Sequence, residues 1–348
     1  MDRYQSLVPI LPFQPGVCSF CHQSAVSEER ICSTCHEQAR LLGLEMNSLG
    51  RARLLNGSKT AIATCLPIFL RLHRGAGYYS AGYEYKSAAS IDAATHRDAQ
   101  MFMSSILKMA LGHEKCIAKH LSMSEEKFGV VTWIPSKRER VGTHPLEDII
   151  RSVAGERVQS LLAYNGEKVN DSNAHVPRPD MWKVASSSRV PRTVLVIDDT
   201  WTKGSSLLSA AHTLLSAGVE RVGLLPLGRH SSQYGTYKSP GHKFEEFSQS
   251  LKWQGSYCAL CDTRAVMRAQ PNLLSQYQDF LGDPEIASKA ALAFEAHDNQ
   301  KAEKGGRIHH ASFGIGKIVW VGGITMAADF GTYGIKVLPT DNRAVDWL

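Results

Sequence analysis

The stretch from Arg192 to Ser206, RTVLVIDDTWTKGSS, constrains the fold of this chain more than any other segment. It opens with an unbroken apolar run, Val194 to Ile197, which is typical of a buried central strand in a parallel sheet. Asp198 and Asp199 follow at the carboxyl end of that run, where open α/β sheets bind their ligands. The stretch therefore predicts an α/β fold with a ligand site at one edge of the sheet.

A turn of small and hydroxyl-bearing residues separates these two acids from an apolar helical pattern, Leu207 to Leu215. Backbone N–H groups at the start of a helix bind phosphate well, and paired carboxylates suit the vicinal hydroxyls of a sugar. We therefore expect a receptor for a phosphorylated ribose, although an ordinary βα unit with an acidic loop is the alternative. The residues expected to bind this ligand are Thr200, Thr202, Lys203, Gly204, Ser205 and Ser206, with the phosphate on Thr202 to Ser206.

The segment VLVIDDTWTKGSS resembles the 5-phosphoribosyl-1-pyrophosphate (PRPP) loop of type I phosphoribosyltransferases. The resemblance implies a doubly wound parallel sheet, a ribose held by the catalytic pair Asp198 and Asp199, and Mg²⁺ bound together with PRPP. That family usually has a threonine where this chain has Lys203. The lysine would either add an ionic contact to the phosphate or crowd it.

Composition and charge narrow the class of protein. The 348 residues are 43% apolar and 21% charged, which is ordinary for a globular protein of two or three domains. The formal charge of +6 favours phosphate-bearing partners without requiring nucleic acid. No apolar run reaches the roughly 18 residues of a membrane span, and the first residues lack the apolar core of a signal peptide. We expect a cytoplasmic protein with no membrane partner and with reduced thiols.

Four of the eight cysteines form two Cys-x₂-Cys pairs near the start of the chain, Cys18 with Cys21 and Cys32 with Cys35. Such pairs predict a closed tetrahedral site for structural Zn²⁺, with free thiols or redox chemistry as the alternative. The metal would stabilise a segment too short to bury a core of its own.

The other four cysteines do not form two neighbouring pairs of this kind. Cys258 and Cys261 form a third Cys-x₂-Cys pair that His242, Asp262 or another chain could complete, but coincidence or a buried local pair explains it equally well. Cys65 and Cys116 are isolated in the sequence. We interpret these two as packing residues.

A cysteine zinc module followed by a PRPP-loop domain resembles the ComF-like proteins. The stretch from His73 to Lys86 is similar to their Gly/Tyr…Lys segment, and Gly129 to Leu146 is similar to their next strand and basic loop. In that family the loop faces pyrophosphate, although a solvated basic loop without a ligand is the alternative here. The residues concerned are Ser136, Lys137, Arg138 and Arg140. The polar stretch from Asn165 to Arg192 departs from the family's pattern, which leaves the acceptor pocket open.

The segments around this loop complete the predicted α/β pattern. Val130 to Ile134 and Arg221 to Leu227 are interpreted as buried strands, and Pro145 to Tyr164 as an amphipathic helix. Strands that alternate with helices predict a parallel sheet with helices on both faces.

The last forty residues show short β-patterned runs separated by glycines. Their motifs HASFGIG, VWV and ADFGTYGIKVL resemble the small SH3-like or Tudor-like barrel of UvrD-type helicases. The resemblance implies docking on DNA or on a protein such as a helicase or an RNA polymerase, with a merely structural appendage as the alternative. The domain organisation expected is a zinc module at 1–50, a phosphoribosyltransferase-like domain at 51–248, a helical extension at 249–304 and the barrel at 305–348.

Two functions follow from these patterns. The first is a phosphoribosyltransferase that transfers the phosphoribosyl group of PRPP to a nitrogen acceptor and releases pyrophosphate. The alternative is a non-catalytic PRPP or nucleotide sensor, an accessory protein of DNA uptake, recombination or repair, as the ComF resemblance implies.

Overall fold

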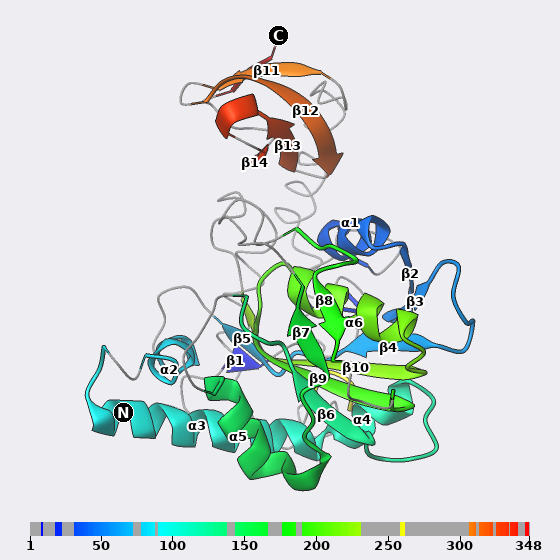
Figure 1. Cartoon of the computed structure of the whole chain (residues 1–348), viewed down its shortest axis with the longest axis vertical. Helices are drawn as coiled ribbons and strands as arrows, with labels where there is room; N and C mark the ends of the chain where they lie inside the picture. Colours follow the sequence, from blue (N-terminus) through cyan, green and yellow to red (C-terminus); the bar gives the residue numbers. More distant parts are fainter. Residues whose placement is uncertain are drawn as a thin grey trace, which may run out of the picture.

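The computed structural model describes the following residues: 8–9, 18–22, 31–71, 78–87, 90–137, 143–165, 176–185, 190–230, 258–261, 306–310, 313–322, 325–333, 335–339 and 345–347 (Figure 1). An eight-stranded sheet forms the centre of the fold. Its strands are β1 (Val8–Pro9), β2 (Leu44–Asn47), β3 (Arg51–Leu54), β4 (Ile62–Cys65), β5 (Phe69–Arg71), β6 (Val130–Trp133), β9 (Thr193–Trp201) and β10 (Arg221–His230).

The middle of this sheet is parallel. Strand β9 lies between β6 and β10 and is parallel to both. On its other side β10 pairs first with β4 and then with β5, again in parallel. Only the margins are antiparallel, where β3 and β2 extend the sheet beyond β4, and β1 pairs with β5. The expected α/β fold with a mostly parallel sheet is confirmed.

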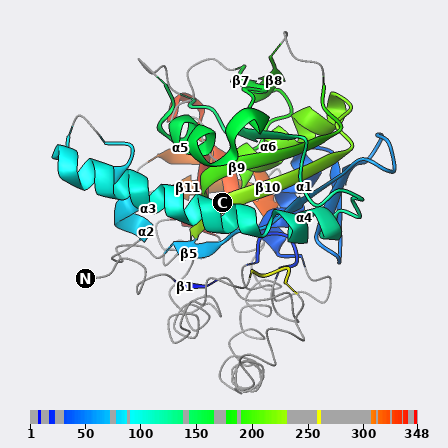
Figure 2. The same ribbon diagram turned by 90° about the horizontal axis from the view of Figure 1, so that it is seen from below.

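Helices cover both faces of the sheet (Figure 1, Figure 2). One face carries α2 (Tyr78–Glu84), α3 (Ala93–Gly112), α4 (Glu114–His120) and α5 (Pro145–Ala154), and the other carries α1 (Ser33–Leu41) and α6 (Ser205–Ser216). Alternate residues of β9 serve the two cores. Leu195 and Ile197 pack toward α3 and α5, whereas Val194 and Val196 pack toward α6. This two-sided burial explains why the strand is apolar without interruption.

The segment from Pro145 to Tyr164 is not one helix, which corrects the sequence-based prediction. Helix α5 ends at Ala154, and Gly155 follows with a φ of 61°, a left-handed conformation that glycine adopts readily. After a 3₁₀ turn (Gly155–Arg157), strand β7 (Leu162–Tyr164) pairs with β8 (Trp182–Val184). The apolar residues of this segment are buried, as their spacing predicts. Those after the 3₁₀ turn, however, lie in extended chain and not in a helix.

The C-terminal residues form a separate, wholly antiparallel sheet of five strands in the order β14-β13-β12-β11-β15. Its core contains Ile308, Ile318 and Phe330. The strands are β11 (Arg307–His310), β12 (Gly314–Gly322), β13 (Thr325–Asp329), β14 (Ile335–Pro339) and β15 (Val345–Trp347), with a 3₁₀ turn at Gly331–Tyr333. Among the residues that the structure describes, no helix has the length and hydropathy needed to cross a bilayer.

Candidate functional site

Asp198 and Asp199 lie in the part of β9 that extends beyond the end of β6. Strand β6 pairs with β9 only as far as Ile197, whereas β10 continues to pair with it up to Trp201. Asp198 and Asp199 therefore stand just beyond the end of β6, at the carboxyl edge of the parallel strands. This edge is the one at which α/β proteins bind ligands.

The two carboxylates differ in their surroundings. Asp198 is half-buried, and its Oδ1 accepts a hydrogen bond of 2.9 Å from the backbone N–H of Asp199. Burial, followed by the negative charge of Asp199, raises the pKa of Asp198 well above its usual range. A cation or hydroxyl donors at this position would relieve that cost.

Asp199 is buried and is contacted from the segment that follows α2. The Tyr85 hydroxyl donates to Asp199 Oδ2 at 3.1 Å, and the Lys86 ammonium forms an ion pair with the same oxygen. Lys86 belongs to the Gly/Tyr…Lys segment singled out in the sequence, and the fold brings it to the acids. The part played by the buried Tyr85 was not foreseen, because nothing in the sequence relates it to Asp199.

The turn after β9 leads directly into α6. Gly204 precedes the helix with a φ of 87°, and a side chain there would collide with the indole of Trp201. The first-turn N–H groups of a helix have no partner within it, which makes them available to an anion. Of the predicted phosphate-binding residues, Thr202 is exposed, whereas Thr200, Lys203 and Ser206 are half-buried and Gly204 and Ser205 are buried.

Two lysines lie near this edge. Ser136 and Lys137 follow β6 and are half-buried. Burial lowers the pKa of Lys137, while the charge of Asp198 opposes that shift, so the two groups are close enough to interact. Burial also lowers the pKa of Lys203. The remaining predicted pyrophosphate residues, Arg138 and Arg140, lie outside the described residues.

Arg178 is a further cation that sequence reasoning missed. Its positive charge acts on Lys137, its backbone N–H donates to Ser209 Oγ at 3.0 Å, and its Nη2 lies 3.4 Å from the Tyr164 hydroxyl. It comes from the polar stretch that departs from the family's pattern. A cation in that stretch carries no recognisable motif, and only the fold brings it to α6 and β7.

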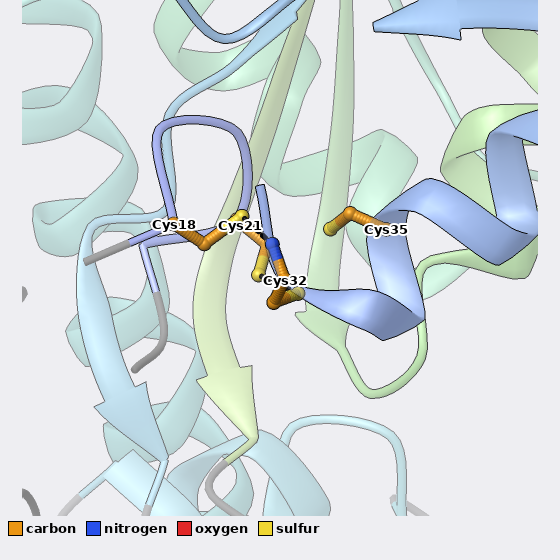
Figure 3. A group of neighbouring side chains, drawn as sticks. All are labelled: Cys18, Cys21, Cys32 and Cys35. Atoms are coloured by element: carbon orange, nitrogen blue, oxygen red, sulfur yellow. Dashed lines mark hydrogen bonds between the residues drawn. The ribbon is translucent and has the colours of Figure 1, made fainter. Parts of the chain in front are cut away.

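The four N-terminal cysteines come together as predicted (Figure 3). Cys18 and Cys21 lie on a tight turn, whereas Cys32 and Cys35 belong to the start of α1. All four Sγ atoms lie within 4.8 Å of one another, and Cys21 Sγ lies 3.7 Å from Cys32 Sγ. Four thiolates around a tetrahedral Zn²⁺ with bonds near 2.3 Å stand about 3.8 Å apart, so the cluster fits zinc and leaves no position open for substrate.

Arg229 joins this cysteine cluster to the turn after β9. The guanidinium is buried, and its Nη1 donates to the carbonyl oxygens of Thr202 at 2.8 Å and Trp201 at 3.4 Å. Its Nη2 lies 3.9 Å from Cys21 Sγ. Burial lowers the pKa of Arg229, but the neighbouring thiols, Cys21 foremost, outweigh it and leave the pKa raised. The first cluster and the candidate phosphate turn are thus one connected structure.

A second group of potential metal ligands lies on the opposite side of the sheet. It consists of His113, Cys116, Cys258 and Cys261, whose ligand atoms also lie within 4.8 Å of one another. The interpretation of Cys116 as an isolated packing residue was wrong, and the partners of the third Cys-x₂-Cys pair within the described residues are His113 and Cys116. His242 and Asp262, which sequence reasoning considered, lie outside those residues.

Comparison with known proteins adds no relative: neither a protein-family model nor a curated sequence matches the chain. Any function must therefore be inferred from the residues gathered at the carboxyl edge of the sheet.

Proposed function

We propose that this chain binds PRPP or a related phosphorylated ribose at the edge formed by β9 and α6, as a phosphoribosyltransferase-like protein. The observation that carries the proposal is the position of Asp198 and Asp199 beyond the end of β6, immediately before a glycine-initiated helix. The resemblance of this segment to the PRPP loop, and of the chain to ComF-like proteins, supports the same assignment.

In this proposal the chain holds the sugar in position and stabilises the negative charges of the phosphate and pyrophosphate groups. The two carboxylates accept hydrogen bonds from the ribose hydroxyls, and the first turn of α6 receives the 5′-phosphate. Lys137, close to Asp198, stabilises the charge that develops on the leaving pyrophosphate. Oxygen donors of this kind suit Mg²⁺, which would neutralise the pyrophosphate when bound with PRPP.

The reaction itself needs little acid–base help from the chain. A bond forms between the acceptor nitrogen and C1 of the ribose, the bond from C1 to pyrophosphate breaks, and the nitrogen gives up a proton to solvent. Holding donor and acceptor in line supplies most of the rate enhancement in such a transfer. The acceptor would lie near Arg178, whose charge acts on Lys137, and near Tyr164, which Arg178 contacts.

A titration calorimetry experiment with Mg²⁺–PRPP tests the proposed site. We expect measurable binding by the natural chain and a loss of at least about 100-fold in affinity for Asp198→Asn combined with Asp199→Asn, since both hydrogen-bond acceptors for the sugar are weakened. Asp98→Asn on the exposed side of α3 is the matched control and should bind normally. Equal binding by the double variant and the control would refute the assignment.

The ion pair between Lys86 and Asp199 favours a second candidate function, a sensor that binds PRPP without turnover. One of the two acids is already engaged by the chain itself, so ligand binding would exchange a protein contact for a sugar contact. Pyrophosphate release, measured with a panel of bases, amines and ammonia, separates the two functions. Release with any acceptor establishes the enzyme, whereas tight binding without release establishes the sensor.

For the C-terminal sheet we propose docking on a protein or on DNA. An aromatic group formed by His310, Phe313 and Phe330 lies beneath the exposed Tyr333, with the Lys336 ammonium 5.4 Å from the centre of the Phe313 ring. Binding to DNA that weakens steeply as salt increases would identify nucleic acid as the partner. Binding to a protein that depends on Tyr333 and changes little with salt would identify protein docking instead.

A further inference from the structure

We propose that His113, Cys116, Cys258 and Cys261 form a second structural zinc site, which fastens the chain beyond β10 to the junction of α3 and α4. Figure 2 shows the yellow segment Cys258–Cys261 beside α4. The site lies apart from the proposed PRPP site and shares no residue with it.

The ligand atoms have the separations that a tetrahedral zinc ion requires. Cys261 Sγ lies 3.6 Å from Cys258 Sγ and 3.9 Å from Cys116 Sγ. The Nδ1 atom of His113 lies 3.5 Å from Cys261 Sγ and 3.9 Å from Cys116 Sγ. Bonds of about 2.3 Å to sulfur and 2.0 Å to nitrogen in a tetrahedron place sulfur atoms about 3.8 Å apart and sulfur about 3.5 Å from nitrogen.

The backbone holds both halves of the site in the compact turns that zinc ligands use. Cys261 N–H donates to Cys258 O at 3.0 Å, and Cys258 N–H donates to Cys261 Sγ at 3.2 Å. In the other half, the N–H of Cys116 donates to the carbonyl of His113 at 2.8 Å, where α3 ends and α4 begins. The same kind of amide–sulfur contact occurs in the first cluster, from Cys32 N–H to Cys18 Sγ at 3.3 Å.

The alternatives explain less. A disulfide needs sulfur atoms about 2.05 Å apart, whereas all eight cysteines are free thiols here. Simple packing would not bring an imidazole nitrogen and three thiols to one point. Three thiolates and one imidazole are a recurrent ligand set of structural zinc sites, and they leave no coordination position for a substrate.

The consequence of the site is mechanical. Cys116 and Cys261 are 145 residues apart in the chain, so the metal closes a very long loop. Between the two cysteines of the later pair, Ala259 is 2% exposed and packs into the core beneath α3 and α5, beside the half-buried Leu260. The apolar contact is small, and zinc would supply most of the free energy that holds this segment in place.

Metal content of the full-length chain tests the proposal. We expect two zinc ions per chain by elemental analysis. Cobalt titration of the metal-free chain should saturate at two equivalents, with the thiolate charge-transfer bands and the strong visible bands of tetrahedral coordination. Saturation at one equivalent would overturn the proposal without any substitution.

A matched pair of variants locates the second ion. His113→Ala removes a ligand and should leave one zinc per chain, whereas His113→Cys restores a four-ligand set and should keep two. Cys65→Ala removes a thiol outside both clusters and should also keep two. Hydrogen exchange should rise in residues 113–121 and 258–261 for His113→Ala alone. Two ions in His113→Ala, or one ion in both His113 variants with unchanged exchange, would contradict the site.

Discussion

The two cysteine clusters lie on opposite faces of the same sheet and differ in what they contact. The first packs with α1 and α6, and its Cys21 reaches the turn after β9 through Arg229. The second packs with α3 and α5, and its four ligands include none of the residues proposed to hold PRPP. Two structural zinc sites in one chain should therefore have different effects: loss of the first should impair both folding and ligand binding, and loss of the second should impair only the folding of its surroundings.

The largest expected effect comes from removing one ligand on each side. Cys32→Ser opens the first cluster, and because a structural zinc contributes several kcal/mol to folding, we expect loss of one zinc, a strongly lowered Tm and loss of Mg²⁺–PRPP binding. Cys116→Ser opens the second and should also lose one zinc. Its affinity for PRPP should stay within about twofold, since that cluster meets β9 through the apolar core around Leu195 and Ile197 and supplies none of the groups proposed to bind the ligand.

Elemental analysis, thermal unfolding and calorimetry on the two variants check this contrast. If both variants lose PRPP binding equally, the faces are coupled through the sheet and the division proposed between the clusters is wrong.

The difference between the clusters also explains what could be predicted from the sequence. The first is recognisable because its pairs lie close together, as Cys-x₂-Cys repeated after ten residues. The second joins a His-x₂-Cys at a helix junction to a Cys-x₂-Cys 145 residues later, and no local pattern relates the two halves. Apolar strands such as Val194 to Ile197 were predictable for the same reason as the first cluster, because a buried strand is recognisable from a few consecutive apolar residues.

The candidate site likewise contains residues that could be predicted from the sequence and residues that could not. The acids and the Gly204 turn form one continuous segment, so their placement after a buried strand and before a helix was predictable from the sequence. The contacts made by Tyr85, Arg178 and Arg229 depend on tertiary structure and were not. The helix predicted from Pro145 to Tyr164 was wrong beyond Ala154, since an apolar period fits buried extended chain as well as it fits a helix.

Arg229 tests the link between the first cluster and the binding turn. Arg229→Met keeps the bulk of the side chain but removes the donors to the Thr202 and Trp201 carbonyls, so the turn loses its support. We expect both zinc ions to remain and PRPP affinity to fall about tenfold, which corresponds to one or two charged hydrogen bonds. Arg229→Lys should recover part of that loss.

Zinc analysis and calorimetry on the same preparations show whether Arg229 supports the turn after β9. Normal affinity in Arg229→Met would mean that the first cluster supports the turn by packing alone, for which the Phe20 and Trp201 rings, 6.0 Å apart, are the obvious contact.

Lys86 tests the charge balance of the acids themselves. Lys86→Met leaves the buried Asp199 without its ion-pair partner while Asp198 remains nearby, so we expect the Tm to fall by a few degrees at neutral pH. Lys86→Arg keeps the positive charge and should lose less. Differential scanning calorimetry checks both, and an unchanged Tm in Lys86→Met would show that the ion pair contributes nothing to the fold.

The smallest effect expected is a gain in stability from Asp198→Asn. Burial and Asp199 raise the pKa of Asp198 in the folded chain, so ionisation of this carboxyl opposes folding at neutral pH. The asparagine variant should therefore melt a few degrees higher than the natural chain at pH 7. As the pH falls through the raised pKa toward the ordinary range of aspartate, the natural carboxyl takes up its proton and the difference in Tm should shrink.

A stabilising substitution that also weakens PRPP binding is the signature of a ligand site, since the charge that costs stability is the one that the sugar would use. A variant less stable than the natural chain at pH 7 would instead mark Asp198 as a structural residue, and the contrast between the two faces would then rest on Arg229 alone.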